Sequence, residues 1–302
     1  MKTVMIGDIG PVPAVGLGMM RFAGCDDPPA FLRAALASGL NFFDHADIYG
    51  GGESERIFGK AMAGMGVPRE SYVLQSKCGI CTGYYDLSKE HILNSADKSL
   101  YRLNTEYLDI LLLHRPDALM EPEEVAEAFD ELYEKGKVRR FGVSNMNPLQ
   151  IQLLRKYVRQ PLIVNQMQLS LVESRLIDSG LHVNTASENA VMRAGSVLEY
   201  CRMEDIVIQV WSPLQYGAIH GFYLGNPDYP ALNAEIDRLA GQYGVSNTAV
   251  ALAWVLRHPA TPQVIAGTVS VKRIPALLEA ANIELTRPEW YELYRTAGKN
   301  LP

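Results

Sequence analysis

The sequence contains little cysteine and no long apolar run. Its four cysteines are too few for a disulfide scaffold in a chain of 302 residues. No apolar run approaches the length of a membrane-spanning helix, and the N-terminus has Asp8 and a turn where a signal peptide needs a long apolar stretch. We therefore expect a cytoplasmic protein that does not bind a membrane.

Positive charge is also scarce. The 28 Lys and Arg residues are outnumbered by 34 Asp and Glu residues, which gives a formal net charge of -6. Because a basic face is the usual footprint of nucleic-acid binding, this charge argues against nucleic acid as a partner. A small-molecule partner is expected instead, and the sequence carries no signal for the number of chains that assemble.

A Rossmann fingerprint of the form G-x-G-x-x-G is missing as well. Gly16-Leu17-Gly18 lacks the third glycine, and the glycines at 50–52 do not follow an expected strand. The sequence therefore predicts no Rossmann domain.

A C-x-x-C pair is formed by Cys78 and Cys81, which could be a redox pair or half of a metal site. No second Cys/His pair with zinc spacing follows, and a thioredoxin-type motif should open a helix, so we interpret the pair as two loop thiols. Asp44, His45 and Asp47 could also suggest metal ligands. Adjacent residues on a strand point to opposite faces, so Asp44 and His45 would not converge, and we predict no metal site.

Strand-like and helix-like runs alternate along most of the chain, which is typical of a parallel sheet with crossover helices. The count of eight strands favours an α/β (β/α)8 TIM barrel over an open doubly wound sheet. Before them, the apolar residues 4–6, a Gly-Asp turn and Val12 predict a short N-terminal β-hairpin at the barrel bottom. Residues 1–302 are expected to form a single domain. The expected strands are 14–17, 40–43, 72–76, 108–113, 138–143, 162–164, 206–210 and 263–266.

Two insertions, at about 169–194 and 212–230, interrupt this alternation. Long loops after barrel strands often shape a substrate site. Apolar and aromatic residues near several strand ends could line an apolar pocket, with ordinary loop packing as the alternative for each: Met19, Met20, Phe22, Tyr84, Tyr85 and Tyr216.

Four side chains at or just after strand ends could together run one carbonyl reduction: Asp44, Tyr49, Lys77 and His114. In a (β/α)8 barrel the carboxyl ends of the strands meet at the rim where active sites lie. Tyr49 could donate a proton to the carbonyl oxygen, and a nearby Lys77 ammonium would lower its pKa. Asp44 would keep the lysine charged and aimed, while His114 would donate a hydrogen bond that orients the carbonyl.

Several motifs, in order along nearly the whole chain, resemble the signature of the aldo-keto reductases. The first is the run 41–50 around Asp44 and Tyr49, followed by Glu53, Glu55 and Gly59. The others lie at 76–77, 111–114, 136–145 and 211–214. This resemblance implies a TIM barrel that binds a nicotinamide cofactor across its rim without a Rossmann domain, and it implies Tyr49 as the general acid/base.

The resemblance also implies cofactor contacts at the ends of later strands. Ser144, Asn145 and Gln166 match residues that hold the nicotinamide carboxamide, and an amide side chain supplies both a donor and an acceptor for such a group. Trp211 matches the aromatic residue that stacks on the nicotinamide ring, with Ser212 and Leu214 in the same motif.

The cofactor tail is expected at the loop 267–273. A loop that opens a helix offers free backbone N–H groups to a phosphate, which points to Gly267, Thr268 and Ser270. Arg273 matches a residue that contacts the adenosine 2′-phosphate, so the expected cofactor is NADPH rather than NADH. Gly267 departs from the pattern, because many members carry a phosphate-binding lysine there.

The predicted function is therefore the reduction of an aldehyde or ketone to an alcohol by direct hydride transfer from NADPH. An alternative is a nicotinamide-binding regulatory or redox-sensing subunit on the same fold, with little turnover. A further alternative is an unrelated barrel lyase or isomerase that uses Lys77 as a Schiff-base nucleophile. The sequence does not indicate which carbonyl compound is the substrate.

Overall fold

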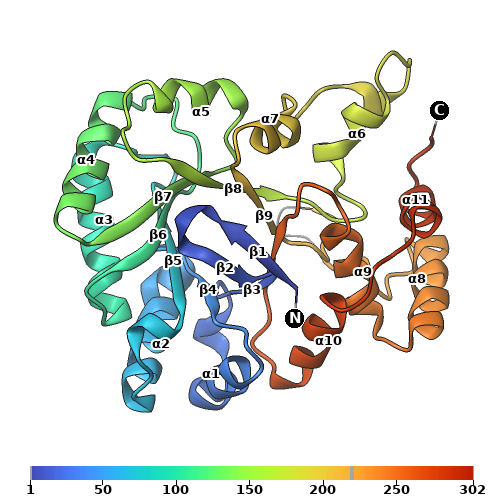
Figure 1. Cartoon of the computed structure of the whole chain (residues 1–302), viewed down its shortest axis with the longest axis horizontal. Helices are drawn as coiled ribbons and strands as arrows, with labels where there is room; N and C mark the ends of the chain where they lie inside the picture. Colours follow the sequence, from blue (N-terminus) through green and yellow to red (C-terminus); the bar gives the residue numbers. More distant parts are fainter. Residues whose placement is uncertain (1, 218–220, 302) are drawn as a thin grey trace.

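The chain folds into a closed barrel of eight parallel strands with helices around it (Figure 1). The computed structural model describes residues 2–217 and 221–301. Around the barrel the strands follow the order β10-β3-β4-β5-β6-β7-β8-β9, and β10 pairs with β9 to close the ring. The strands are β3 (Val15–Gly18), β4 (Phe42–Asp44), β5 (Val73–Cys78), β6 (Leu108–Leu113), β7 (Val138–Ser144), β8 (Leu162–Gln168), β9 (Val207–Trp211) and β10 (Gln263–Ala266). The predicted barrel is confirmed.

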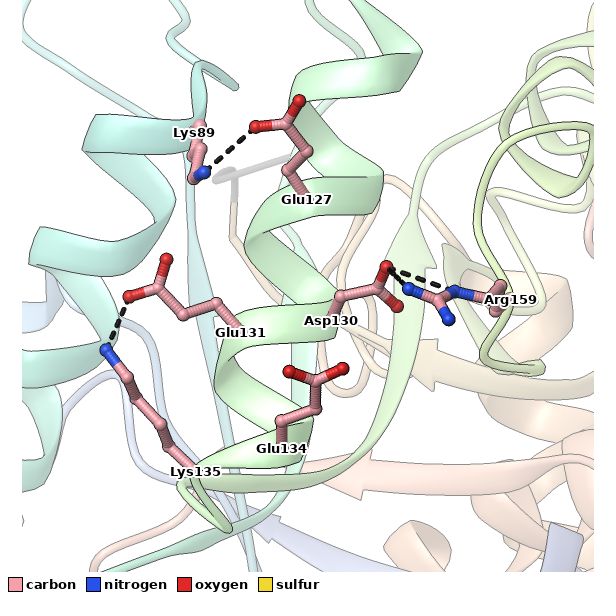
Figure 2. A pocket seen from close by; sticks show the side chains of 7 residues that line it. All are labelled: Lys89, Glu127, Asp130, Glu131, Glu134, Lys135 and Arg159. Atoms are coloured by element: carbon pink, nitrogen blue, oxygen red, sulfur yellow. Dashed lines mark hydrogen bonds and ion pairs between the residues drawn. The ribbon is translucent and has the colours of Figure 1, made fainter.

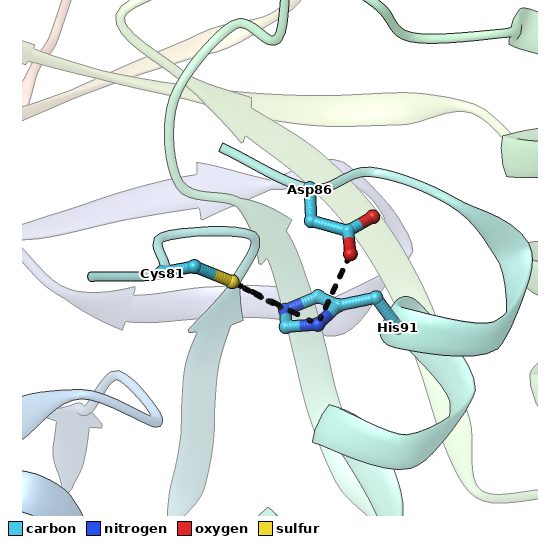
Figure 3. Close-up of side chains that lie close together, drawn as sticks. All are labelled: Cys81, Asp86 and His91. Carbon is cyan, nitrogen blue, oxygen red and sulfur yellow. Dashed lines mark hydrogen bonds and ion pairs between the residues drawn. The ribbon is translucent and has the colours of Figure 1, made fainter. Parts of the chain in front are cut away.

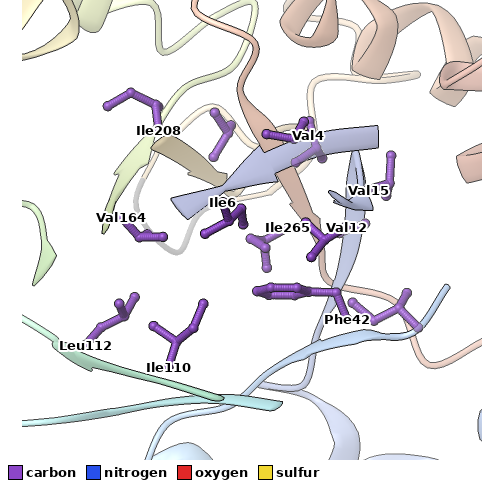
Figure 4. Packing of buried hydrophobic residues seen from close by; sticks show 14 of the residues in the cluster. Val4, Ile6, Val12, Val15, Phe42, Ile110, Leu112, Val164, Ile208 and Ile265 are labelled. Carbon is purple, nitrogen blue, oxygen red and sulfur yellow. The ribbon is translucent and has the colours of Figure 1, made fainter. Parts of the chain in front are cut away.

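The predicted N-terminal hairpin is confirmed as well. Strand β1 (Thr3–Ile6) pairs antiparallel with β2 (Gly10–Pro13). Ile6 and Val12 are buried among the barrel's apolar side chains, as Figure 4 shows. The turn of the hairpin lies against Ile163 at the start of β8, so the hairpin covers the amino-terminal end of the barrel. The opposite, carboxyl-terminal rim holds the candidate site.

Most of the outer layer is formed by eleven α-helices in the described chain, with short 3-10 turns between elements. The helices are α1 (Pro28–Ala37), α2 (Glu53–Met65), α3 (Lys89–Leu103), α4 (Pro122–Glu134), α5 (Pro148–Arg155), α6 (Arg175–Leu181), α7 (Val197–Met203), α8 (Pro230–Tyr243), α9 (Asn247–Leu256), α10 (Ile274–Ala280) and α11 (Arg287–Thr296). Capping residues set several starts: the Ser88 side chain accepts from His91 N–H, and Thr286 forms a capping box with Glu289. Among the described residues, no helix is both long and apolar enough to cross a membrane.

Candidate active site

A buried ion pair lies at the carboxyl-terminal rim, between the last residue of β4 and the penultimate residue of β5. The Lys77 ammonium donates to Asp44 Oδ2 at 2.8 Å, to the His45 carbonyl at 2.7 Å and to Tyr49 Oη at 3.1 Å. These three acceptors match the three donors of an ammonium group. The ammonium is thereby held in one position, against the phenol oxygen. Burial opposes the charge on Lys77, but Asp44 and Tyr49 outweigh it and raise the pKa of the lysine.

Tyr49 follows β4 by one short loop, in the turn Tyr49–Gly52. Burial raises the pKa of its phenol, although the Lys77 charge and hydrogen bond act in the opposite direction. Lys77 thus lowers the pKa of Tyr49 as the sequence predicted, but desolvation of the phenolate exceeds this effect, so the net shift of the pKa is upward. At neutral pH Tyr49 is a protonated phenol beside a fixed positive charge, which is the form a proton donor requires.

His114 lies directly after β6, and its ring stands edge-on to the Tyr49 ring with centroids 6.0 Å apart. Burial, together with the charges of Lys77 and Arg115, lowers the pKa of His114 to about 2. The imidazole is therefore neutral at physiological pH, with one N–H to donate. Its buried Nδ1 has no hydrogen-bond partner within the described part of the chain.

His45 is separated from Asp44 as predicted, since its ring packs edge-on against Phe58 of α2 at 4.7 Å while Asp44 bonds to Lys77. Burial and the Lys77 charge hold the pKa of His45 well below its usual value. The two side chains do not converge on a common point, and His45 serves as part of the packing between barrel and helix.

A layer of buried glutamines lies across the barrel at the level of Asp44, and only Gln166 among them was predicted as a site residue. Gln75 and Gln166 donate to Asp44 Oδ1 at 2.5 and 3.1 Å. Both also donate to Gln209 Oε1, while Gln209 Nε2 donates to Gln75 and to Gln263. The strand register pairs Asp44 with Gln75, and Gln209 with both Gln166 and Gln263, so the five side chains lie at one level. A polar amide next to apolar residues of a strand was the sequence feature that could have indicated the layer.

The residues expected to hold a carboxamide form a connected cluster at the ends of β7, β8 and β9. Asn145 Nδ2 donates to Ser144 Oγ at 2.8 Å, and the Ser144 hydroxyl donates to the Gln166 carbonyl at 2.9 Å. The Trp211 indole N–H donates to Asn145 Oδ1 at 3.2 Å, and the Arg115 guanidinium lies 5.7 Å from the centre of the Trp211 ring. The hydrogen bond from its N–H to Asn145 thus fixes the orientation of the half-buried indole at the rim.

The remaining expected cofactor contacts lie in two loops. Ser212 follows β9 with a φ of 51° and bonds to the side chain of Gln215, while Leu214 is half-buried against the core. After β10, Thr268 is buried and its Oγ1 accepts from the Ser270 N–H at 3.2 Å, whereas Gly267 is exposed. Arg273 is exposed in the short 3-10 turn Val271–Arg273 that leads into α10.

Two of the residues expected to line a substrate pocket belong to the core instead. Met19 and Phe22 are fully buried, and the Phe22 ring packs against Phe31 and Phe58. For these two residues the alternative of ordinary packing is confirmed, because the chain after β3 packs against α1 and α2. Met20, Tyr84 and Tyr85 are exposed, and Tyr216 is half-buried.

A charged pocket of about 320 Å³ lies on the outer helices, away from the rim side chains (Figure 2). Each of its three cations is paired with a carboxylate, and a fourth carboxylate, Glu134, also lines it. Lys89 pairs with Glu127 at 2.9 Å, Lys135 with Glu131 at 2.6 Å, and Arg159 with Asp130. Because the pairs of Lys89 and Arg159 join α4 to neighbouring segments and the pair of Lys135 lies at the end of α4 itself, we assign the pocket to the scaffold.

Comparison with known proteins gives consistent matches over the whole barrel. The family model described as "Aldo/keto reductase family" matches residues 14–296. Oxidoreductase YdhF of Escherichia coli (strain K12) is 35% identical over 284 residues, covering 90% of this chain and 88% of YdhF. A 6-dehydroglucose reductase of Agrobacterium fabrum is 32% identical over 317 residues, covering 100% of both chains. A Klebsiella pneumoniae aldo-keto reductase crystallised with NADPH superimposes with a TM-score of 0.77 at 29% identity, covering 97% of this chain and 94% of that one.

Proposed function

The chain belongs to the aldo/keto reductase family, and from this membership we propose that it reduces an aldehyde or ketone to the alcohol with NADPH, using Tyr49 as the proton donor. The observation that carries the proposal is the buried ammonium of Lys77, fixed between Asp44 and the Tyr49 phenol at the carboxyl-terminal rim. When bound there, the reduced nicotinamide supplies hydride to the carbonyl carbon.

Tyr49 gives its proton to the carbonyl oxygen as that oxygen gains negative charge. The phenolate left behind lies 3.1 Å from the fully buried Lys77 ammonium, whose charge stabilises it. Asp44 keeps the ammonium charged and stationary. Because burial raises the pKa of Tyr49, its phenol keeps its proton at neutral pH until the carbonyl oxygen takes it.

Neutral His114 orients the carbonyl. Its ring lies edge-on to Tyr49, so one imidazole N–H and the phenol O–H can both reach a single oxygen above the rim. A neutral imidazole donates without delivering its own proton, which leaves proton transfer to Tyr49. Tyr49 is therefore the proposed acid, and His114 is the proposed group that orients the carbonyl.

The carboxamide is proposed to bind between Ser144, Asn145 and Gln166, beside the Trp211 ring. Both N–H groups of Gln166 are already donated, to Asp44 and to Gln209, so its Oε1 is the atom left to accept from the carboxamide NH2. Trp211, held through its indole N–H by Asn145, offers a flat apolar surface to the ring. Ser212 and Leu214 complete this wall.

The phosphates are proposed to bind at the loop after β10. Lys272 and Arg273 are exposed, and within residues 2–217 and 221–301 neither forms an ion pair with a carboxylate. Two unneutralised cations beside Gly267, Thr268 and Ser270 suit a dianionic phosphate, and the planar Arg273 guanidinium suits bidentate binding. This supports NADPH over NADH, even though Gly267 supplies no side-chain cation.

The test is NADPH oxidation, followed by absorbance, against a panel of small aldehydes, diketones and sugar aldehydes, with Tyr49→Phe as the matched variant. A 6-dehydro sugar is included because a 6-dehydroglucose reductase is 32% identical over the full chain. We expect turnover that Tyr49→Phe lowers by about 10²–10⁴-fold, the range for one general acid, while NADPH affinity is unchanged. Tight NADPH binding without turnover across the panel would instead support the regulatory alternative.

A further inference from the structure

A cysteine, an aspartate and a histidine converge beside the rim, between the loop after β5 and the first turn of α3. Cys81 Sγ lies 4.0 Å from His91 Nδ1, and Asp86 Oδ2 lies 3.8 Å from the same nitrogen, as Figure 3 shows. One potential metal-binding atom from each residue lies within 4.8 Å of the others. They are spaced five residues apart, at 81, 86 and 91, which is not a familiar metal-binding motif, so they could not be grouped from their spacing.

Backbone contacts hold the loop that carries two of these residues. The Cys81 N–H donates to the Tyr84 carbonyl at 3.0 Å, and Ile80 and Tyr85 form an antiparallel bridge. Asp86 Oδ1 accepts from the Ser88 N–H at 2.9 Å, which turns its other oxygen toward His91. The carboxylate is therefore oriented before any ligand binds.

The histidine is oriented as well. His91 Nε2 lies 3.2 Å from Ser95 Oγ, one turn further along α3. With the Nε2 proton donated to this hydroxyl, Nδ1 carries the lone pair and lies 3.8 Å from Asp86 Oδ2. Cys81 Sγ lies almost equally far from both ring nitrogens, at 4.0 Å from Nδ1 and 3.9 Å from Nε2, so the Cys81 side chain must turn toward the Nδ1 lone pair to share a metal with it. In a metal-bound histidine, the N–H of the ring nitrogen that does not bind the metal commonly donates a hydrogen bond to a neighbouring acceptor. This bond fixes both the tautomer and the orientation of the ring.

We propose that Cys81, Asp86 and His91 bind a Zn²⁺ ion, with water as the fourth ligand. Thiolate, imidazole and carboxylate are the ligands that Zn²⁺ takes in proteins, and three of them leave one open tetrahedral position. Zinc bonds of these types put neighbouring ligand atoms roughly 3.4–3.6 Å apart on a tetrahedron. The two separations from His91 Nδ1, 3.8 and 4.0 Å, need a contraction of a few tenths of an ångström. The thiol and the carboxylate lie within 4.8 Å of each other and must approach by up to about 1.2 Å, which movement of the loop after β5 would supply. Binding releases the thiol proton to solvent.

Cys78 takes no part in this site, although it forms the C-x-x-C with Cys81. It is a buried residue of β5, 1% exposed, and its Sγ faces the Leu112 carbonyl at 4.0 Å. The sequence interpretation of two loop thiols was therefore wrong for Cys78. The proposal also departs from the prediction of no metal, which considered only that cysteine pair and the residues around Asp44.

The test uses Co²⁺ as a spectroscopic probe on the full chain, followed by Zn²⁺ competition. We expect saturable binding of one ion per chain, with a thiolate-to-cobalt absorption band that Zn²⁺ abolishes. Cys81→Ser should remove the band, and Asp86→Asn and His91→Ala should each weaken binding by at least about tenfold. Cys25→Ser, a partly buried thiol elsewhere, and Glu90→Gln, an exposed carboxylate beside the site, are the controls.

Thermal unfolding supplies a second readout that does not depend on cobalt spectroscopy. At one fixed Zn²⁺ concentration the Tm of the wild type and of both controls should rise, and the Tm of each of the three site variants should rise less. Each variant is first measured with chelator, so that loss of folding is distinguished from loss of binding. Absence of the thiolate band in the wild type, or equal binding by Cys81→Ser, would overturn the proposal.

Discussion

Lys77 and Asp44 form an ion pair of 2.8 Å in which the two side chains are 0% and 2% exposed. Each partner is bound on several sides: the ammonium also meets the His45 carbonyl and Tyr49, and the carboxylate also accepts from Gln75. Two charges removed from water depend on one another, because neither has solvent to replace a lost partner. The pair therefore links the chemistry of the rim to the stability of the barrel.

This dependence predicts a non-additive pair of substitutions. Lys77→Met leaves the Asp44 carboxylate buried without its cation and should lower the free energy of unfolding by about 3–5 kcal/mol. Adding Asp44→Asn removes the uncompensated charge, so the double variant should be more stable than Lys77→Met alone. Urea unfolding of the four proteins measures the coupling. Strictly additive losses would show that the two charges do not stabilise each other.

The glutamine layer predicts a second effect on stability, which is independent of the charges of the ion pair. Gln209→Met removes the donor to Gln75 Oε1 and to Gln263 Oε1, and each buried acceptor left without a donor costs about 1–3 kcal/mol. Gln152→Met, the same replacement on the exposed face of α5, should change stability by less than about 0.5 kcal/mol. Equal unfolding midpoints for the two variants would mean that the layer contributes nothing.

The barrel could be predicted from the sequence because its strands are short apolar runs separated by helical ones. All eight expected strands exist, but β8 extends to Gln168 where the sequence predicted an end at 164. The reason is physical. Asn165 and Gln166 are buried because their amides donate to the Met146 carbonyl, in the loop after β7, and to Asp44 of β4, and a linear pattern cannot distinguish such residues from a loop.

The candidate site was predictable in its positions and less so in its electrostatics. Strand ends located Asp44, Lys77 and His114, because parallel strands bring their carboxyl ends to one rim. The direction of the Tyr49 pKa shift depends on how completely the phenol is desolvated, which only the folded chain determines. For the same reason the cluster of Cys81, Asp86 and His91, assembled by a loop, left no signal in the sequence.

Arg273 and Lys272 provide a test of the proposed phosphate site. If Arg273 binds the 2′-phosphate, Arg273→Ala should raise the Kd for NADPH by roughly 10–100-fold, the loss of about 1.5–3 kcal/mol for a charged hydrogen bond. The Kd for NADH, which lacks that phosphate, should change little. Lys272→Ala, which removes the second proposed phosphate cation, should also weaken NADPH binding selectively. Lys60→Ala, on the exposed face of α2, is the control for the loss of one exposed positive charge. Fluorescence titration with both cofactors measures the difference, and equal losses for NADPH and NADH would contradict the assignment.

Asp47 predicts an unusual dependence of stability on pH. Burial, followed by the neighbouring Glu55 charge, raises the pKa of Asp47 to about 6, and its Oδ1 is buried without a hydrogen-bond partner in the described chain. The folded protein therefore holds this proton to a higher pH than the unfolded chain does. It follows that the contribution of Asp47 to the free energy of unfolding falls as pH rises from about 4 to about 6, and remains low above that range.

Replacing the Asp47 carboxylate with an amide should remove the loss of unfolding free energy that its ionisation causes. A shift of about two pKa units corresponds to about 3 kcal/mol at most, so Asp47→Asn should raise the free energy of unfolding at about pH 7 by roughly 1–3 kcal/mol and add little at about pH 4. Asp97→Asn, on the exposed face of α3, controls for the loss of one negative charge. Urea unfolding at both pH values gives the difference between variant and wild type. If that difference were the same at the two pH values, Asp47 would be ionised over the whole range and its burial would carry no electrostatic cost.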